Sequence, residues 1–203
     1  MKDLVQKQLT QSIATMQAVL DDPHIADILI SIGQLTATAM QSGHKLMVAG
    51  NGGSAADAQH LVAEFVVRLT VNRPALRAIA LTTDSSILTA CGNDFGYEHV
   101  FERQVEALGQ AGDVFLGIST SGNSPNILNA LKQASKMGIT TVGFSGSDGG
   151  KMRELCDHNI VVPSNVTMNI QESHLALEHI FCMIVERFIY GRDFDTKPQV
   201  LSE

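Results

Sequence analysis

The sequence predicts an α/β protein with a doubly wound, five-stranded parallel sheet in the order 2-1-3-4-5, preceded by a pair of N-terminal helices. From residue 44 onward, short apolar runs alternate with helical segments, which is the pattern of successive β-α-β units. Right-handed crossovers between such units place helices on both faces of the sheet. The 203 residues suffice for one full hydrophobic core, and no repeat or long linker divides them. We therefore expect a single domain over residues 1–203.

Residues 1–42 are predicted to form two helices, because apolar residues recur there at helical spacing. The sequence Asp21–Pro23 interrupts the pattern and separates the two helices. A minimal α/β domain does not need two helices before its first strand. They can serve simply to cover the sheet, but we favour packing between subunits.

Residues 43–165 are predicted to form the α/β core. Its expected strands are Lys45–Ala49, Ala78–Leu81, Val114–Ile118, Thr140–Phe144 and Asn159–Val162. Helical stretches are expected at Ser54–Leu69, Ser85–Asn93, Glu98–Leu108, Ser124–Met137 and Met152–Cys156.

Residues 166–190 are predicted to form a buried C-terminal helix, because the stretch Asn169–Phe188 is apolar nearly all round. In a chain of this size, such a helix packs on the sheet and also suggests a subunit interface. Its polar side chains need an explanation, since buried polar groups are normally partnered. They are Gln171, Glu172, His174, Glu178 and His179.

Composition excludes several classes of partner. The formal charge is −7, from 14 basic and 21 acidic side chains, and no basic tract is present, so we expect no nucleic-acid partner. No apolar run is long enough to span a membrane, and no signal peptide is visible. Cys91, Cys156 and Cys182 are widely spaced and odd in number, which is typical of core residues in a reducing compartment. We expect a cytoplasmic protein that does not bind membranes.

The segment Gly50–Ser54 follows the first predicted strand and opens a helix. Glycines permit a tight turn and close approach of an anion, and a helix N-terminus offers free N–H groups. The segment also fits a dinucleotide-binding fingerprint, but the acidic residue expected about 20 residues later is missing. That absence disfavours a nicotinamide dehydrogenase. A phosphate-binding loop and a purely structural turn both remain open from these residues alone.

A second polar loop, Ser119–Pro125, follows the third predicted strand and carries four hydroxyl groups. Ser124 is a candidate N-cap and Pro125 suits the first helical position. Capping explains Ser124 but leaves the other hydroxyls without a role. In a sheet of order 2-1-3-4-5, strands 1 and 3 are neighbours and their carboxyl ends form the crevice where ligands bind. A phosphorylated small molecule is therefore the expected ligand.

Four residues are candidates for proton transfer or metal binding. His60 and Glu64 share a helix face at four-residue spacing, which alone equally suits a solvated surface pair. Gln171 and His179 lie on the apolar C-terminal helix, where a single histidine is more often a satisfied core residue. They are eight residues apart, or ~12 Å along a straight helix. Both can reach one centre only if Gln171 lies on a non-helical lead-in, or if one of them comes from another subunit.

The sequence resembles the sugar isomerase (SIS) domain family, and within it the bacterial phosphoheptose isomerases, over almost its full length. Four segments together carry this resemblance and make it specific. They are GNGGSAADAQHLVAEF at 50–65, TACGNDFGYEHVFERQV at 89–105, AGDVFLGISTSGNSPNI at 111–127 and IQESHLALEHIF at 170–181.

The resemblance implies isomerisation of sedoheptulose 7-phosphate to D-glycero-D-manno-heptose 7-phosphate, an early step toward ADP-heptose and the lipopolysaccharide core. It also implies a homotetramer with active sites between subunits. Zinc, one ion per subunit, would be bound by His60, Glu64, Gln171 and His179. The sugar phosphate would contact Gly52, Gly53, Ser54, Glu64, Asn93, Asp94, Ser119, Thr120, Ser121, Ser124 and Gln171.

Aldose–ketose isomerisation moves a proton between C1 and C2 through an enediol, so it needs a base near the carbon and an acid near the carbonyl oxygen. We assign Glu64 as the base and His179 as the acid, a role that imidazole suits near neutral pH. Zinc creates a tension, because a coordinated carboxylate is a poorer base. Either zinc polarises the carbonyl, or Glu64 leaves the metal when substrate binds.

Two non-enzymatic functions compete with this hypothesis. Some SIS relatives are tetrameric binding modules that associate with the bacterial replication initiator, and others sense sugar phosphates without turnover. In the binding modules, residues unable to do the chemistry occupy the positions of Glu64 and His179. The acid/base pair is present here, which favours the enzyme.

Overall fold

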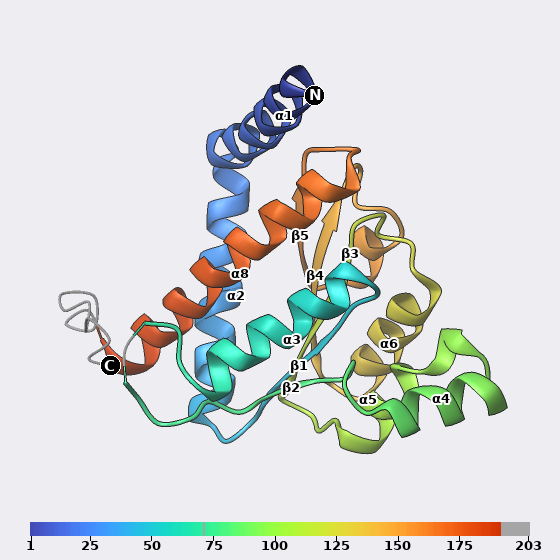
Figure 1. Ribbon diagram of the computed structural model, residues 1–203. Helices are drawn as coiled ribbons and strands as arrows, with labels where there is room; N and C mark the ends of the chain where they lie inside the picture. The colour runs from blue at the N-terminus through green and yellow to red at the C-terminus, as the bar shows by residue number, and fades with distance from the viewer. Residues whose placement is uncertain (71, 192–203) are drawn as a thin grey trace.

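The computed structural model describes residues 1–70 and 72–191, and its five parallel strands form one sheet in the order β2-β1-β3-β4-β5 (Figure 1). The predicted α/β class, strand order and N-terminal helical pair are therefore confirmed. The strands are β1 (Leu46–Ala49), β2 (Ala78–Ala80), β3 (Val114–Ser119), β4 (Thr140–Gly146) and β5 (His158–Val162). The helices are α1 (Lys2–Asp21), α2 (Pro23–Gln41), α3 (Gly53–Val66), α4 (Ser85–Asp94), η1 (Tyr97–His99), α5 (Glu102–Leu108), α6 (Pro125–Lys136), α7 (Met152–Leu155) and α8 (Thr167–Tyr190).

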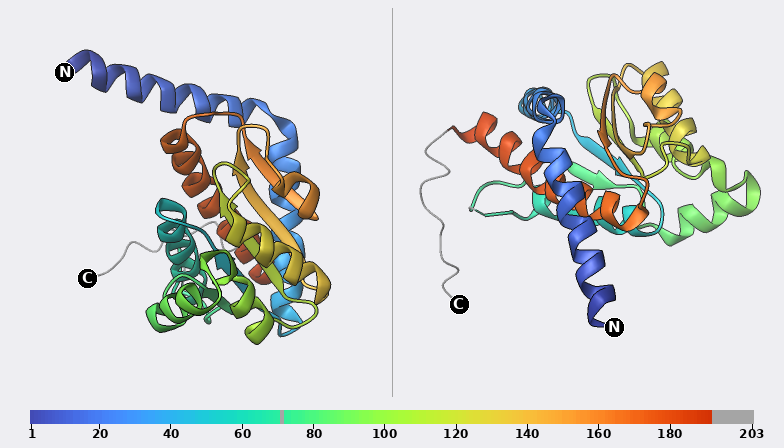
Figure 2. Two further views of the ribbon diagram at one scale, coloured as in Figure 1. Left: turned by 90° about the vertical axis from the view of Figure 1, so that its right-hand side faces the viewer. Right: turned by 90° about the horizontal axis from the view of Figure 1, so that it is seen from above.

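The sheet is covered on both faces because successive side chains of each strand point to opposite sides. In β1, Leu46 and Val48 join one hydrophobic cluster with α2, α3 and α8, whereas Met47 and Ala49 join a second cluster with α4 and α6. Figure 2 shows the two helical layers on either side of the sheet. Near-continuous apolar strands are what a parallel sheet buried on both faces requires.

The two N-terminal helices differ in their packing. In α2, Ile25, Leu29 and Ile32 are buried in the core, so this helix covers the sheet. The helix α1 projects from the body of the molecule (Figure 1), and Thr15 is its one buried residue. Its apolar side chains, such as Leu9 and Ile13, are 59% and 67% exposed. The helix α2 thus covers the sheet, whereas most apolar side chains of α1 are left exposed by the described residues. Packing of these helices between subunits stays a prediction.

The C-terminal helix α8 is less buried within one chain than its sequence predicts. One side packs against α2, α3 and the sheet, but Ile180, Met183 and Phe188 are each about 45% exposed. With Leu29 and Ile30 of α2, the exposed side borders an apolar groove of about 650 Å³.

Several element ends coincide with the predicted ones, and the others differ by up to four residues. The helix predicted at Ser54–Leu69 ends at Val66, and Glu98–Leu108 divides into η1 and α5. Among the described residues, Cys91 and Cys182 are buried, Cys156 is half-buried, and all three are free. No helix of the described ranges is long and apolar enough to cross a membrane. Residues 192–203 of the expected domain lie outside the described residues.

Candidate active site

The two polar loops predicted from the sequence lie side by side at the carboxyl edge of the sheet. Strands β1 and β3 are neighbours, with Ala49 paired to Gly117, so the loops that follow them share one edge. Two hydrogen bonds join the loops directly. The Asn51 amide donates to Asn126 Oδ1 at 2.9 Å, and the Asn126 amide donates to Asn51 Oδ1 at 2.8 Å. A reciprocal pair of amides thus ties the first loop to the first turn of α6 (Pro125–Lys136), directly after the second loop.

The first loop places backbone N–H groups at the start of α3. Gly52 has φ +56° and is the N-cap residue, and no side chain caps the helix there. A Cβ at Gly50 would lie 2.3 Å from the carbonyl oxygen of Ser54, so only glycine permits this tight turn. Together with the helix N-terminus, this geometry suits an anion.

The second loop gathers hydroxyl groups at the start of α6. Ser119 and Ser124 share a hydrogen bond of 2.9 Å, and Ser121 Oγ lies 3.5 Å from Ser119 Oγ. Ser124 is the N-cap residue and Pro125 begins the helix, as predicted, but the Ser124 hydroxyl makes no capping bond. The hydroxyl cluster is therefore available for a ligand rather than committed to the helix. Thr120 is half-buried beside it.

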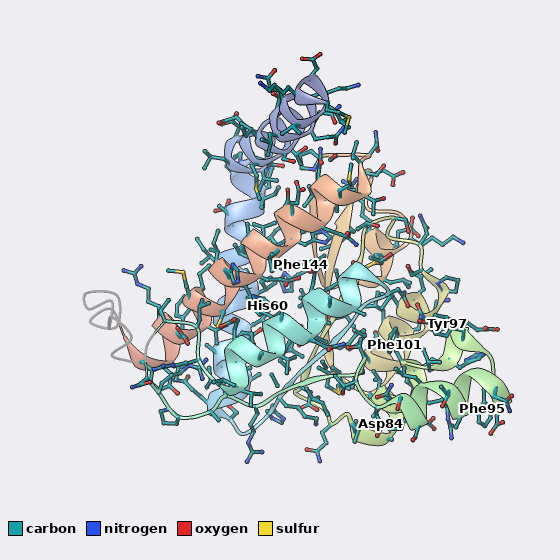
Figure 3. All side chains as sticks on the ribbon, viewed as in Figure 1. His60, Asp84, Phe95, Tyr97, Phe101 and Phe144 are labelled. Carbon is teal, nitrogen blue, oxygen red and sulfur yellow. The ribbon has the colours of Figure 1, made fainter. Side chains whose placement is uncertain are left out.

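Three of the four candidate metal ligands, His60, Glu64 and His179, meet between α3 and α8, which lie side by side (Figure 3). His60 Nε2 lies 2.8 Å from His179 Nε2, and the rings pack edge to face. Glu64 Oε1 lies 3.5 Å from His60 Nε2. One ligand atom from each of the three residues lies within 4.8 Å of the others. His60, with its side chain 44% exposed, faces solvent, whereas the Glu64 side chain is 17% exposed.

Gln171 lies two helical turns from this cluster. It is within α8, so the non-helical lead-in is excluded. Its side-chain amide packs against Gly53, where an added Cβ would lie 2.6 Å from Gln171 Nε2. Since α3 and α8 run in the same direction, Gln171 faces the first loop while His179 faces His60. Gln171 and His179 of one chain therefore lie at opposite ends of the site.

Asn93 and Asp94 lie at the exposed carboxyl end of α4. They hydrogen-bond each other at 2.7 Å rather than either loop. The segment after α4 does reach the first loop, because the Tyr97 hydroxyl donates to Asn51 Oδ1 at 3.1 Å. Among the described residues, Tyr97 thus contacts the first loop, whereas Asn93 and Asp94 contact neither loop within one chain.

Buried polar groups of α8 divide into satisfied and unsatisfied ones. His174 is buried and its Nε2–H donates to the carbonyl oxygen of Ser145 at 3.0 Å. Glu178 is fully buried and both its carboxylate oxygens lack a hydrogen-bond partner among the described residues. Burial, reinforced by the negative charge of Asp57, raises the pKa of Glu178 well above its ordinary value. Not every polar residue of this helix is therefore partnered, contrary to the sequence-based expectation.

The sequence of this chain is similar to a known protein family and to several of its members. A sequence model described as the SIS domain matches residues 10–146. The phosphoheptose isomerase of Burkholderia pseudomallei strain K96243 is 53% identical over 188 residues, covering 91% of this chain and 95% of its own. That of Aneurinibacillus thermoaerophilus is 49% identical over 194 residues, covering 96% and 98%.

The chain belongs to the SIS domain family, and within it to the phosphoheptose isomerases. Solved structures agree. The phosphoheptose isomerase of Neisseria gonorrhoeae superposes with a TM-score of 0.86 at 39% identity, covering 91% of this chain and 98% of its own. That of Francisella tularensis gives the same TM-score at 33% identity, with 91% and 97% covered.

Several residues that shape this phosphoheptose isomerase site were not identified from the sequence. Asn51 and Asn126 are 75 positions apart, and asparagine is common in turns, so no local pattern links them. Arg73, which contacts both α3 and α8, lies in a connection that resembled an ordinary loop.

Proposed function

We propose that this chain converts sedoheptulose 7-phosphate to D-glycero-D-manno-heptose 7-phosphate in the cytoplasm, as an early step toward ADP-heptose and the lipopolysaccharide core. The observation that carries the proposal is the cluster of Glu64, His60 and His179 on α3 and α8, near the glycine-rich and hydroxyl-rich loops. From Gly53 to His60 is seven residues, or ~10 Å along α3. A seven-carbon sugar phosphate, with its phosphate and carbonyl at opposite ends, is an extended ligand suited to that separation.

The loops bind the phosphate and the helices supply the proton chemistry. The phosphate lies against the N–H groups of Gly53 and Ser54 and the hydroxyls of Ser119, Ser121 and Ser124. Glu64 takes the proton from C1 of the ketose and His179 delivers a proton to the carbonyl oxygen, which gives the enediol. Glu64 then returns its proton to C2 while His179 takes the proton from the C1 hydroxyl, which forms the aldehyde and restores both side chains. Proton transfer by positioned groups of this kind contributes ~10²–10⁴-fold to the rate.

The donor set fits zinc. Two imidazole nitrogens and one carboxylate, with ligand atoms within 4.8 Å of one another, are groups that zinc takes, and three protein ligands leave a position open. A bound zinc ion would act as a Lewis acid toward the substrate oxygen. His60 has no part in proton transfer in this scheme, so its role is to hold the metal.

The fourth proposed ligand, Gln171, must come from another subunit or serve the phosphate loop alone. Within one chain it packs against Gly53, two turns of α8 from His179. A homotetramer with active sites between subunits satisfies this geometry and also covers the exposed apolar side chains of α1 and α8. Asn93 and Asp94, which contact neither loop within one chain, would then contribute to the site of a neighbouring chain.

Two other functions are distinguished by the same residues. A binding module for the replication initiator needs no acid/base pair, and a sugar-phosphate sensor needs no base near C1. The proximity of Glu64 to two histidines favours catalysis over both. The deciding test is conversion of sedoheptulose 7-phosphate by the purified protein, followed by NMR of the products. Tight binding of the sugar phosphate without conversion would favour the sensor.

Removal of His60 tests the metal site separately. We expect His60→Ala to lower zinc affinity by ~10–100-fold or more, because one of the few protein ligands is lost. Zinc content after dialysis against a defined free zinc concentration measures this. The control is His24→Ala, which removes an exposed histidine from α2. Equal zinc content in both variants would contradict the ligand assignment.

A further inference from the structure

Arg73 lies in the connection between α3 and β2, away from the substrate loops, yet its side chain is completely buried. A buried guanidinium is costly unless it is fully paired. Its hydrogen bonds therefore indicate what it is for.

The guanidinium joins the last turn of α3 to α8. Arg73 donates to the carbonyl oxygen of Glu64 at 2.6 Å and to that of Phe65 at 2.7 Å. It also forms an ion pair with Glu186 of α8 at 2.6 Å, and the Glu186 side chain is 4% exposed. Helix carbonyls in the last turn have no partners within the helix, so a cation is favourable there. These bonds leave little freedom between the two helices.

The same two helices carry the proposed catalytic groups. Glu186 follows His179 by seven residues, so both lie on nearly the same face of α8. The carbonyl that Arg73 binds belongs to Glu64 itself. Between them, Phe65 packs edge to face on Phe181 with ring centroids 5.6 Å apart. The contact is thus continuous from Arg73 to the histidine pair.

We propose that Arg73 and Glu186 form a positioning clamp that sets the distance between Glu64 on α3 and His60–His179 across the two helices. The inference rests on the proposed function, because it assigns a role to residues that support that site. Arg73 touches neither substrate nor metal in this account. It acts through the backbone of Glu64.

The planar fork of arginine is essential to the clamp. It reaches two carbonyls of α3, the carbonyl of Pro74 and one carboxylate at once, whereas lysine offers a single point charge. The substrate loop at Ser54 is ten residues from Glu64, or ~15 Å along α3. Loss of the clamp should therefore disturb proton transfer and metal binding while leaving phosphate binding intact.

The test compares Arg73→Lys and Glu186→Gln with wild type. We expect kcat for sedoheptulose 7-phosphate to fall ~10–100-fold with KM unchanged, and Zn²⁺ affinity of the metal-free protein to fall by a similar factor. Competition with a chromophoric chelator measures the affinity without reference to turnover. If wild type itself converts nothing, the proposed function fails, and the Zn²⁺ affinities still test the clamp.

Asp113→Asn is the matched control for loss of a buried charge. Asp113 is fully buried and accepts from the backbone N–H groups of Lys45 and Gln110 rather than from α3 or α8. It should lower the melting temperature but leave kcat and Zn²⁺ affinity near wild type. The clamp is refuted if Arg73→Lys keeps wild-type kcat and Zn²⁺ affinity, or if it only repeats the effect of Asp113→Asn.

Discussion

The reciprocal amide pair of Asn51 and Asn126 shows how single residues hold the substrate crevice. Each amide both donates and accepts, and Asn126 Oδ1 also accepts from the N–H of Ile127 at 2.9 Å. The pair therefore ties the glycine-rich loop after β1 to the helix after β3. Such pairs are specific because each side chain satisfies the donor and the acceptor of the other.

Asn126→Ala should weaken substrate binding more than chemistry. We expect KM for the sugar phosphate to rise about tenfold, because the net value of a hydrogen bond in a buried pair is about 1 kcal/mol or more. Steady-state kinetics separate KM from kcat. The control is Asn129→Ala on the same helix, whose amide donates to the carbonyl oxygen of Glu98. An unchanged KM in Asn126→Ala would show that the two loops hold their positions independently.

Among single residues, the sequence predicted what local spacing encodes. His60 and Glu64 share a helix face at four-residue spacing, and the structure places them 3.5 Å apart. The Asn51–Asn126 pair joins residues 75 positions apart, and no spacing rule connects them. The resemblance to a family, rather than periodicity, suggested that His179 joins His60.

The helix α8 packs against the sheet through a neutral histidine. His174 lies against β4, and burial lowers its pKa to about 4, although its hydrogen bond to Ser145 acts in the opposite direction. Its other ring nitrogen has no partner among the described residues. The folded protein therefore holds this imidazole neutral where an unfolded chain would bind a proton.

Stability should fall in mild acid because of His174. The unfolded histidine titrates near 6.5 and the folded one near 4, so its contribution is complete above pH ~6.5 and is lost as the pH falls toward 4. Between about pH 7.5 and pH 5, this group should cost about 2 kcal/mol of unfolding free energy. Denaturant unfolding of wild type and His174→Gln at both values measures it.

The variant should show a shallower loss of stability toward acid than wild type. His24→Gln, which replaces an exposed histidine, should retain the wild-type dependence. Equal slopes for wild type and His174→Gln would mean that His174 is protonated in the folded state.

Elements were predictable where burial alone determines them. The strands are short, apolar and buried, so their central residues were predicted correctly. For example, β3 spans Val114–Ser119, and the predicted strand was Val114–Ile118. The end of α3 was not predictable. It stops at Val66 rather than Leu69 because Arg73 and Leu76 bind the carbonyls of the last turn, and these partners come from a distant part of the loop.

At the scale of the whole molecule, apolar side chains of α1 and α8 stay exposed in the single chain. On α1, Leu9, Ile13 and Leu20 are 59%, 67% and 76% exposed. The exposed side of α8 borders the apolar groove beside α2. Contiguous apolar surface of this kind marks protein–protein contact. The strand order was predictable from connection rules, whereas the apolar periodicity of α1 does not show that this helix projects from the rest of the described chain.

Ile13→Glu should dissociate the assembly. In an isolated chain this exposed position would accept a charge at little cost, whereas burial of an unpaired carboxylate between subunits is strongly unfavourable. Light scattering should give wild type about four times the mass of one chain, and the variant less. Lys7→Glu, on an exposed polar position of the same helix, should keep the wild-type mass. A fully active monomer would contradict active sites between subunits.

The most direct test of the account is the rate of sedoheptulose 7-phosphate conversion by wild type, Glu64→Gln and the control Glu172→Gln. Glu172 is exposed on α8, so its replacement makes the same chemical change outside the site. The account predicts aldose formation by wild type and Glu172→Gln, and a fall of ~10²–10⁴-fold in kcat for Glu64→Gln with sugar-phosphate binding retained. Wild-type turnover by Glu64→Gln, or no turnover by any of the three proteins, would contradict it.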